Sequence, residues 1–100
     1  MTRKEFDASV KETFDKCFEL VTAKGKFYGQ QKDRLGQIKK IAVITGTNNI
    51  QAAYNLVAKH FVALGEMAEN EKNFTVEDFD AYLLDIAIYM SIIRALIQDE

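Results

Sequence analysis

The sequence predicts an all-α protein, a compact bundle of four helices in one domain that spans residues 1–100. Three observations favour this class. Apolar residues recur at intervals of three and four along most of the chain, which is the period of an amphipathic helix. Proline is absent and only five glycines are present, so little interrupts a helix. No segment has the alternation expected of a strand of convincing length.

The first helix is expected to begin after Thr2, which forms the pattern of a capping box with Glu5. An apolar stripe follows along it, formed by Phe6, Val10, Phe14, Cys17, Phe18 and Val21. Gly25 is expected to end this helix, because glycine readily adopts the left-handed conformation of a helix C-terminus. Residues 25–32 are then expected to form a loop.

Two shorter patterns predict the second and third helices. Asp33 is expected to cap the second helix, and Gly46 is expected to end it. The apolar residues of the second helix share one face and are Leu35, Ile38, Ile41 and Ala42. Asn48 or Asn49 is expected to cap the third helix. Its inward side is expected to carry Ala53, Leu56, Val57, His60, Phe61, Leu64 and Met67. The polar run 69–73 is the next connection.

The fourth helix is expected to open at Thr75 with Asp78 as its capping partner, and to run to about Gln98. Between residues 83 and 97 its apolar side chains lie nearly all round the helix, which is typical of a helix buried on most sides. It is too short and too polar to span a bilayer. Because four helices of this size cannot bury one of their number completely, we expect a homo-oligomer in which a second subunit covers the rest.

Charge is distributed unevenly along the chain. The net charge is −2, but the segment 24–40 carries six basic residues and one acid, Asp33. The basic residues are Lys24, Lys26, Lys32, Arg34, Lys39 and Lys40. One basic segment in an otherwise acidic protein favours a small anionic ligand over a long nucleic acid, which needs a broader positive face. A solvated charged loop is the alternative interpretation.

The cellular compartment is inferred from the single cysteine and the N-terminus. Cys17 cannot form an internal disulfide, so a reducing compartment and a soluble, cytoplasmic protein are expected, with no membrane partner. Its place in the apolar stripe predicts a small core residue. Residues 1–5 lack the apolar core of a signal peptide.

Few residues are candidates for metal binding or for catalysis. One cysteine and one histidine cannot build a protein-only zinc site, and we assign no metal and no catalytic residue. The favoured interpretation of His60 is a hydrogen-bonded core histidine, and the alternative is a ligand or a base. Closely spaced carboxylates could hold Mg²⁺, although solvated helix ends show the same pattern. They are Glu12, Asp15 and Glu19, then Glu66 with Glu69, and Glu77 with Asp80.

A sharper group surrounds the start of the second helix. Gly29 permits a tight turn, and the free amides of a helix that begins at Asp33 favour anions. Arg34 and Lys39 would add charged donors, and Tyr28 could stack on a base. Together these residues suit a nucleotide. Alternatively, Asp33 only caps the helix, and Arg34 pairs internally with an acid such as Asp85.

Several of these residues belong to a longer pattern. In order, it consists of Tyr28-Gly29, Asp33-Arg34-Leu35-Gly36-Gln37-Ile38-Lys39, Gly46, Ala58-Lys59-His60 and Leu84-Asp85-Ile86-Ala87-Ile88-Tyr89. The pattern resembles small bacteriophage proteins of the nucleotide-modification-associated type, over residues 20–98. Gln37-Ile38 replaces the Asn-Phe of that family. The family is itself similar to the all-α, MazG-like nucleoside triphosphate pyrophosphohydrolases, and the resemblance therefore implies a MazG-like bundle.

The chain departs from those enzymes at the metal ligands. They hold Mg²⁺ with a Glu-x-x-Glu pair on one helix and a Glu-x-x-Asp pair on the next. Asp85 matches the last ligand position, but Tyr82 stands where the glutamate should be. Residues 58–62 contain no carboxylate pair, and Lys59 places a positive charge there. Without a carboxylate cluster, activation of water by two metals has no platform.

The resemblance thus implies a phage protein that binds or sequesters a nucleotide or cyclic-nucleotide signal without metal-dependent hydrolysis or a cofactor. This would be an anti-defence role in the cytoplasm of a bacterial host. The ligand-binding residues are expected to be Tyr28, Asp33, Arg34, Lys39, Lys59, His60 and Asp85. Arg34 and Lys59 would hold phosphate, and Asp33 and Asp85 would orient the basic side chains. One alternative is a divergent MazG-like pyrophosphohydrolase of phage nucleotide metabolism, which would use Mg²⁺ and Asp85. Another is a structural helical interaction module.

Overall fold

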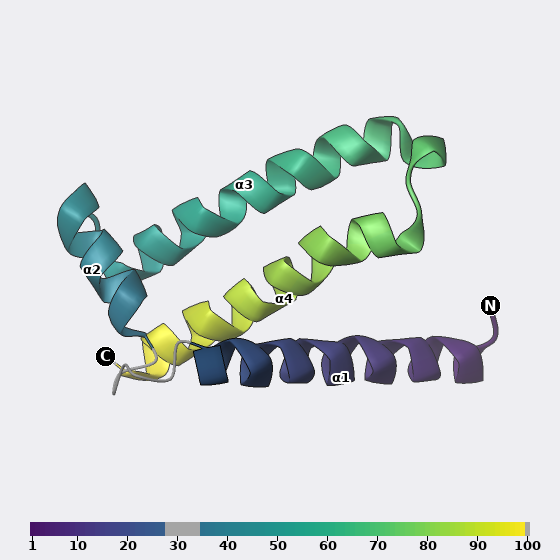
Figure 1. Ribbon diagram of the computed structural model, residues 1–100, viewed down its shortest axis with the longest axis horizontal. Coiled ribbons are helices and arrows are strands. Elements are labelled where there is room, and N and C mark those ends of the chain that lie inside the picture. Colours follow the sequence, from purple (N-terminus) through teal and green to yellow (C-terminus); the bar gives the residue numbers. More distant parts are fainter. Residues whose placement is uncertain (28–34, 100) are drawn as a thin grey trace.

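The computed structural model describes residues 1–27 and 35–99 (Figure 1). Four α-helices account for nearly all of them, and no strand occurs within these two ranges. The helices are α1 (Arg3–Phe27), α2 (Gly36–Thr45), α3 (Asn49–Glu69) and α4 (Val76–Asp99), with a short 3₁₀ helix, η1 (Glu71–Asn73), between α3 and α4. The predicted all-α class and the number of helices are confirmed.

The helix α4 lies between two others. It runs antiparallel to α3, to which η1 connects it, and α1 lies along its other side (Figure 1). The short helix α2 packs against α3 near the C-terminal end of α4. The radius of gyration is 15.5 Å, whereas about 13 Å is typical of a 100-residue domain. The arrangement is therefore open and leaves much helix surface uncovered.

Side-chain caps begin α3 and α4, as predicted. At α3, Asn48 Oδ1 accepts a hydrogen bond from the Gln51 amide at 2.7 Å, and the Gln51 side chain accepts one from the Asn48 amide at 3.1 Å. At α4, the Thr75 amide donates to Asp78 at 2.8 Å, and the Asp78 amide donates to Thr75 Oγ1 at 3.2 Å. Each cap satisfies amides that lack a partner within the helix.

The ends of α1 and the start of α2 differ in part from the prediction. Thr2 caps α1 by accepting from the Glu5 amide at 3.1 Å, as expected. The helix then continues through Gly25 to Phe27, so the predicted stop at Gly25 is wrong. A glycine inside a helix costs only about 1 kcal/mol, which neighbouring turns can outweigh. The N-cap of α2 is Leu35, without a side-chain cap, and the predicted cap Asp33 lies outside the described residues.

Gly46 ends α2, as predicted. Its backbone is left-handed, with φ of 68°. The Gly46 amide donates to the Val43 carbonyl at 3.3 Å, and the Thr47 amide donates to the Ala42 carbonyl at 3.0 Å. This pair of bonds is a Schellman motif, in which glycine avoids the steric cost that a Cβ would meet.

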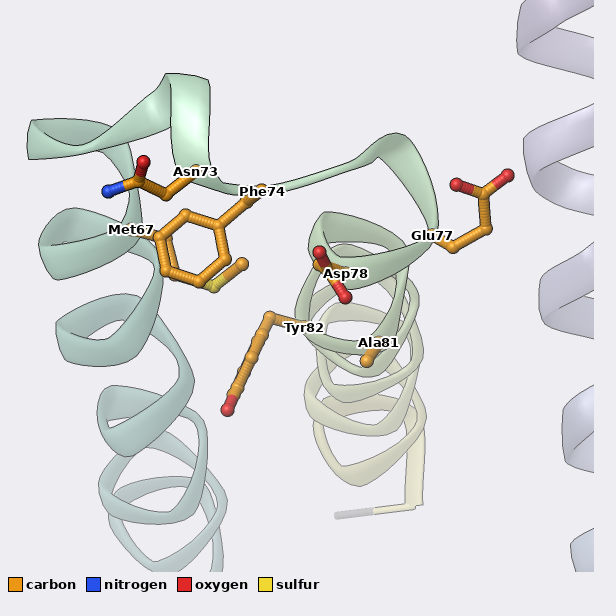
Figure 2. A pocket seen from close by; sticks show the side chains of 7 residues that line it. All are labelled: Met67, Asn73, Phe74, Glu77, Asp78, Ala81 and Tyr82. Atoms are coloured by element: carbon orange, nitrogen blue, oxygen red, sulfur yellow. The ribbon is translucent and has the colours of Figure 1, made fainter.

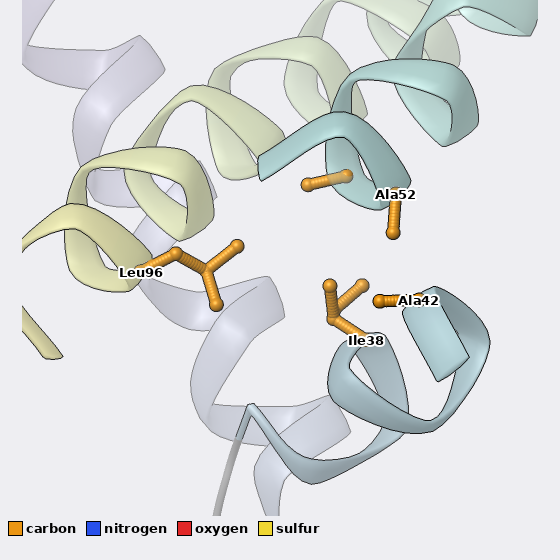
Figure 3. Packing of buried hydrophobic residues seen from close by; sticks show 5 residues of the cluster. Ile38, Ala42, Ala52 and Leu96 are labelled. Atoms are coloured by element: carbon orange, nitrogen blue, oxygen red, sulfur yellow. The ribbon is translucent and has the colours of Figure 1, made fainter. Parts of the chain in front are cut away.

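The best-packed region is the corner where α2, the start of α3 and the end of α4 meet (Figure 3). Its buried cluster consists of Ile38, Ala42, Ala52, Ala53 and Leu96. Farther along the predicted inward side of α3, Val57 and Met67 are buried, while His60 is half-buried. Phe61 is half exposed, so its predicted inward placement is wrong, because it lies beside the α4-facing side of α3 and not on it.

Burial is incomplete on α4 and α1. On α4, only Leu96 is fully enclosed, and Leu83, Met90 and Ile97 are exposed. On α1, Cys17 is buried, as predicted, but the other members of the predicted stripe are exposed. Among the described residues, none of the helices combines the length and the apolar character needed to cross a membrane.

Candidate functional site

A histidine and a carboxylate meet in the seam between α3 and α4. The Nε2 atom of His60 lies 3.1 Å from Oδ2 of Asp85. Their side chains are 23% and 31% exposed, so the pair is sheltered but not closed off. His60 follows the buried Val57 by three residues, which places both on the side of α3 that faces α4. The two residues thus face each other because the helices are paired along that side.

Two tyrosines flank the imidazole. The ring centroid of Tyr82 lies 6.0 Å from that of His60, and the centroid of Tyr89 lies 5.7 Å from it. Tyr82 precedes Asp85 by three residues and Tyr89 follows it by four, so all three side chains share one face of α4. The α4 helix therefore presents a row of tyrosine, aspartate and tyrosine to His60.

The two imidazole nitrogens have different surroundings. The carboxylate of Asp85 can only accept, so Nε2 carries the hydrogen between them. The other nitrogen, Nδ1, is buried and has no hydrogen-bond partner among the described residues. A buried polar atom without a partner costs about 1–3 kcal/mol. The imidazole is consequently fixed at one nitrogen and unsatisfied at the other.

The other predicted site residues in the described ranges do not join this pair. Lys59 is next to His60 in α3, but its side chain lies on the exposed side of the helix. Lys39 makes an ion pair of 2.7 Å with Asp99, at the C-terminal end of α4. The rise of a helix from Asp85 to Asp99 is about 21 Å. Within one copy of the chain, Lys39 and Asp85 thus lie far apart, because α2 packs at the far end of α4. The predicted role of Lys39 in ligand binding stays a prediction.

The remaining predicted residues lie where the structure gives no description. Tyr28, Asp33 and Arg34 fall outside residues 1–27 and 35–99. Their predicted roles in stacking and in phosphate binding stay predictions, as does the alternative pairing of Arg34 with Asp85. What the structure does bring together is the His60–Asp85 pair.

The acids of α4 that were weighed as magnesium ligands have different neighbours. Asp85 contacts His60 of α3, whereas Oδ2 of Asp80 lies 3.5 Å from Nζ of Lys16 in α1. The two carboxylates thus turn toward helices on opposite sides of α4. Glu77 lies nearer the start of the helix, at the rim of a hollow. Within the described ranges, no three His, Cys, Asp or Glu side chains gather into one group.

An open hollow of about 520 Å³ lies where α3, η1 and α4 meet (Figure 2). Its lining residues are Met67, Asn73, Phe74, Glu77, Asp78, Ala81 and Tyr82. Tyr82 points from α4 toward α3, so it borders both this hollow and the imidazole of His60. The hollow and the His60–Asp85 pair therefore have Tyr82 as a common neighbour.

Sequence reasoning missed the tyrosines as neighbours of His60. Tyr82 drew notice only as a replacement for a metal ligand, and Tyr89 only as part of the family pattern. The signal was available in the spacing Tyr82-x-x-Asp85-x-x-x-Tyr89, which places all three side chains on one helix face. What could not be read from the sequence was that this face meets His60.

Comparison with protein-family models, with curated proteins and with solved structures gives no match for this chain. The protein is therefore described by its own fold and site. It is an all-α protein of four helices with a histidine–aspartate pair, flanked by two tyrosines, in the seam between its two paired long helices.

Proposed function

We propose that this protein binds a nucleotide or a nucleotide-derived signal, cyclic nucleotides included, without metal-dependent hydrolysis. Recognition centres on the His60–Asp85 pair. The observation behind this proposal is the state of the imidazole, which is held at Nε2 by Asp85 and whose buried Nδ1 has no partner among the described residues. A ligand whose binding opens the seam enough to contact Nδ1 would supply the hydrogen bond that is missing among the described residues.

Nucleotides carry the groups that this site can recognise. In neutral His60, Nδ1 is an acceptor and suits an N–H of a base or a hydroxyl of ribose; in charged His60 it donates and suits phosphate. The ring of Tyr82, which lines the open hollow, offers a surface on which a base can stack. Lys59, exposed beside His60, can neutralise a phosphate that extends toward solvent.

The basic segment 24–40 supports the same class of ligand at longer range. It is strongly positive in a chain whose net charge is −2. The helix α2 starts within this segment, and the positive end of its dipole adds positive potential there. Because Lys39 lies about 21 Å from Asp85 along α4, we assign the described part of this segment to attracting the anion and not to contacting it at His60.

The placement of the α4 acids favours binding over hydrolysis. Hydrolysis by a MazG-like mechanism needs several carboxylates around shared metal ions. Asp85 turns toward α3 and Asp80 toward α1, so the alternative pyrophosphohydrolase would have to draw a second acid from elsewhere. Tyr82 also stands at the position where the enzymes carry a glutamate.

The biological role in this proposal follows the resemblance to phage nucleotide-modification-associated proteins. A small phage protein that holds a nucleotide without consuming it could sequester an immune signal in the cytoplasm of the bacterial host. A MazG-like architecture and a homo-oligomeric assembly belong to the same proposal. The exposed apolar surface of α1 and α4 supports the assembly.

A thermal-shift screen of mono-, tri- and cyclic nucleotides, with and without Mg²⁺, tests the proposal. We expect one class to raise the melting temperature and to remain chemically intact. Ligand at 100 times its Kd stabilises the native state by about 2.7 kcal/mol. His60→Ala and Asp85→Asn should abolish the shift. Asp99→Asn, which removes an ion pair at the other end of α4, is the matched control and should keep it.

Two outcomes would contradict the proposal in different ways. Mg²⁺-dependent release of pyrophosphate from a triphosphate, lost in Asp85→Asn, would establish the divergent pyrophosphohydrolase. A melting temperature that no nucleotide raises would instead favour the helical interaction module.

A further inference from the structure

The apolar stripe of α1 contains three exposed phenylalanines, Phe6, Phe14 and Phe18, which are together called the aromatic face. The three residues are 57%, 67% and 74% exposed. Val10 and Val21 border this face and are also exposed. Three large rings on one helix are more apolar surface than scattered single residues would give, so the face calls for an explanation.

The contact between α1 and α4 does not cover this face. Cys17 is buried, and Nζ of Lys16 lies 3.5 Å from Oδ2 of Asp80 in α4. These residues mark the side of α1 that packs on α4. Phe14 and Phe18 lie at the edge of that side, and each is mostly exposed. Their surface is therefore free to meet another molecule.

The exposed area is the right size for self-association. A phenylalanine contributes about 200 Å², so the three rings leave roughly 400 Å² open on each copy. Covering this face on two copies would bury about 800 Å² of apolar surface. Since roughly 60% of an interface is apolar, the whole interface would reach about 1,300 Å². Stable specific interfaces bury roughly 1,200–2,000 Å².

The charges beside the face suit a second copy better than a membrane. Lys4, Asp7, Lys11 and Asp15 follow one another along its border and alternate in sign. Two copies of such a border meet without net repulsion. A helix that lies on a membrane surface usually carries an excess of lysine and arginine there. A symmetric pair also lets one patch serve both subunits.

We propose that the aromatic face of α1 is the principal contact between two copies of this protein, with α1 packing on α1 of the partner. This inference rests on the homo-oligomeric assembly of the proposed function and names its contact, but its test does not depend on nucleotide binding, because it concerns a different helix and a different side of α4. It accounts for the apolar surface of α1 that α4 leaves exposed.

Light scattering on the purified full chain tests the proposal. We expect the wild type to form a dimer or a larger assembly at 100 μM, and Phe14→Lys to shift the mass to the monomer of 11.4 kDa. Ile44→Lys is the matched control, because Ile44 is 84% exposed but lies on α2. It should leave the assembly unchanged. Circular dichroism of each variant checks that the helices are retained.

Cross-linking provides a second measurement that needs no loss of assembly. In a Cys17→Ala background, Val10→Cys should form disulfide-linked dimers on mild oxidation. Val43→Cys should not, although this position on α2 is 83% exposed and Val10 is only 38% exposed. A wild type that is monomeric at 100 μM would overturn the proposal. So would a Phe14→Lys variant with the wild-type mass, or a chain that binds anionic vesicles through α1 without associating with itself.

Discussion

Two regions of this protein use the same helical pattern with opposite results. At the corner of α2, α3 and α4, Leu96 is 1% exposed and Ala53 is completely buried. Along α1, an equally regular stripe leaves Phe18 74% exposed. The corner is lined by alanines, Ala42 and Ala52 among them, which let helices approach closely. The comparison shows that an apolar stripe predicts which side of a helix is favoured for burial. It does not predict whether the same chain or another molecule buries that side.

Truncating one apolar side chain in each region should give the largest contrast. Leu96→Ala removes a buried side chain from a packed cluster and should lower the free energy of unfolding by about 2–5 kcal/mol. Phe18→Ala, measured by urea denaturation at a concentration where the chain is monomeric, should change it by about 0.5 kcal/mol or less. Equal losses would show that α1 is packed as firmly as the corner.

Two glycines sharpen the comparison at the level of the backbone. Gly46 has φ of 68°, and an added Cβ would meet no atom within 4 Å, so Gly46→Ala is penalised only through the backbone. We expect a loss of about 1 kcal/mol. Gly65 also has open space around it but lies inside α3, so Gly65→Ala should stabilise by about 0.5–1 kcal/mol. Thermal denaturation of both variants checks the opposite signs. Two shifts of the same sign would contradict the assignment of the α2 end.

Much of the fold could be predicted because it is encoded locally. The caps at Asn48 and Thr75 and the stop at Gly46 depend on residues within one turn, and all three are confirmed. Gly25 shows the limit of such signals. It resembles Gly46 as a terminator, yet α1 passes through it. Whether a glycine ends a helix depends on two small free energies: the cost of glycine inside a helix and the gain from the interactions of the following turn. The sequence alone does not give their difference.

The candidate site was predictable only where facing helices have a simple register. His60 and Asp85 were both selected from the sequence, and the antiparallel packing of α3 and α4 joins them. Lys39 was grouped with them as well, but its partner is Asp99. Its position depends on where α2 docks, which is a tertiary choice. The predicted inward placement of Phe61 is wrong for a related reason. Phe61 follows His60, and each step of one residue turns the side chain by about 100° around the helix.

The smallest expected effect concerns the single thiol between α1 and α4. Burial raises the pKa of Cys17, so less thiolate is present at pH 8 than in a free peptide. We therefore expect an alkylating reagent to modify Cys17 more slowly than it modifies a short cysteine peptide, with mass spectrometry as the measurement. Lys16→Gln removes the ion pair with Asp80 of α4 and should speed the reaction several-fold by weakening the docking of α1.

The neighbouring lysine provides a control for this effect. Nζ of Lys11 lies 2.7 Å from Oδ2 of Asp15, so Lys11→Gln breaks an ion pair within α1 and leaves the contact with α4 intact. Its labelling rate should equal that of the wild type. If Lys11→Gln and Lys16→Gln speed the reaction equally, fraying of α1 and not its separation from α4 exposes the thiol. If wild-type Cys17 reacts as fast as the peptide, α1 is not docked on α4. The well-packed part of the protein would then end at the surface of α4 and would not include α1.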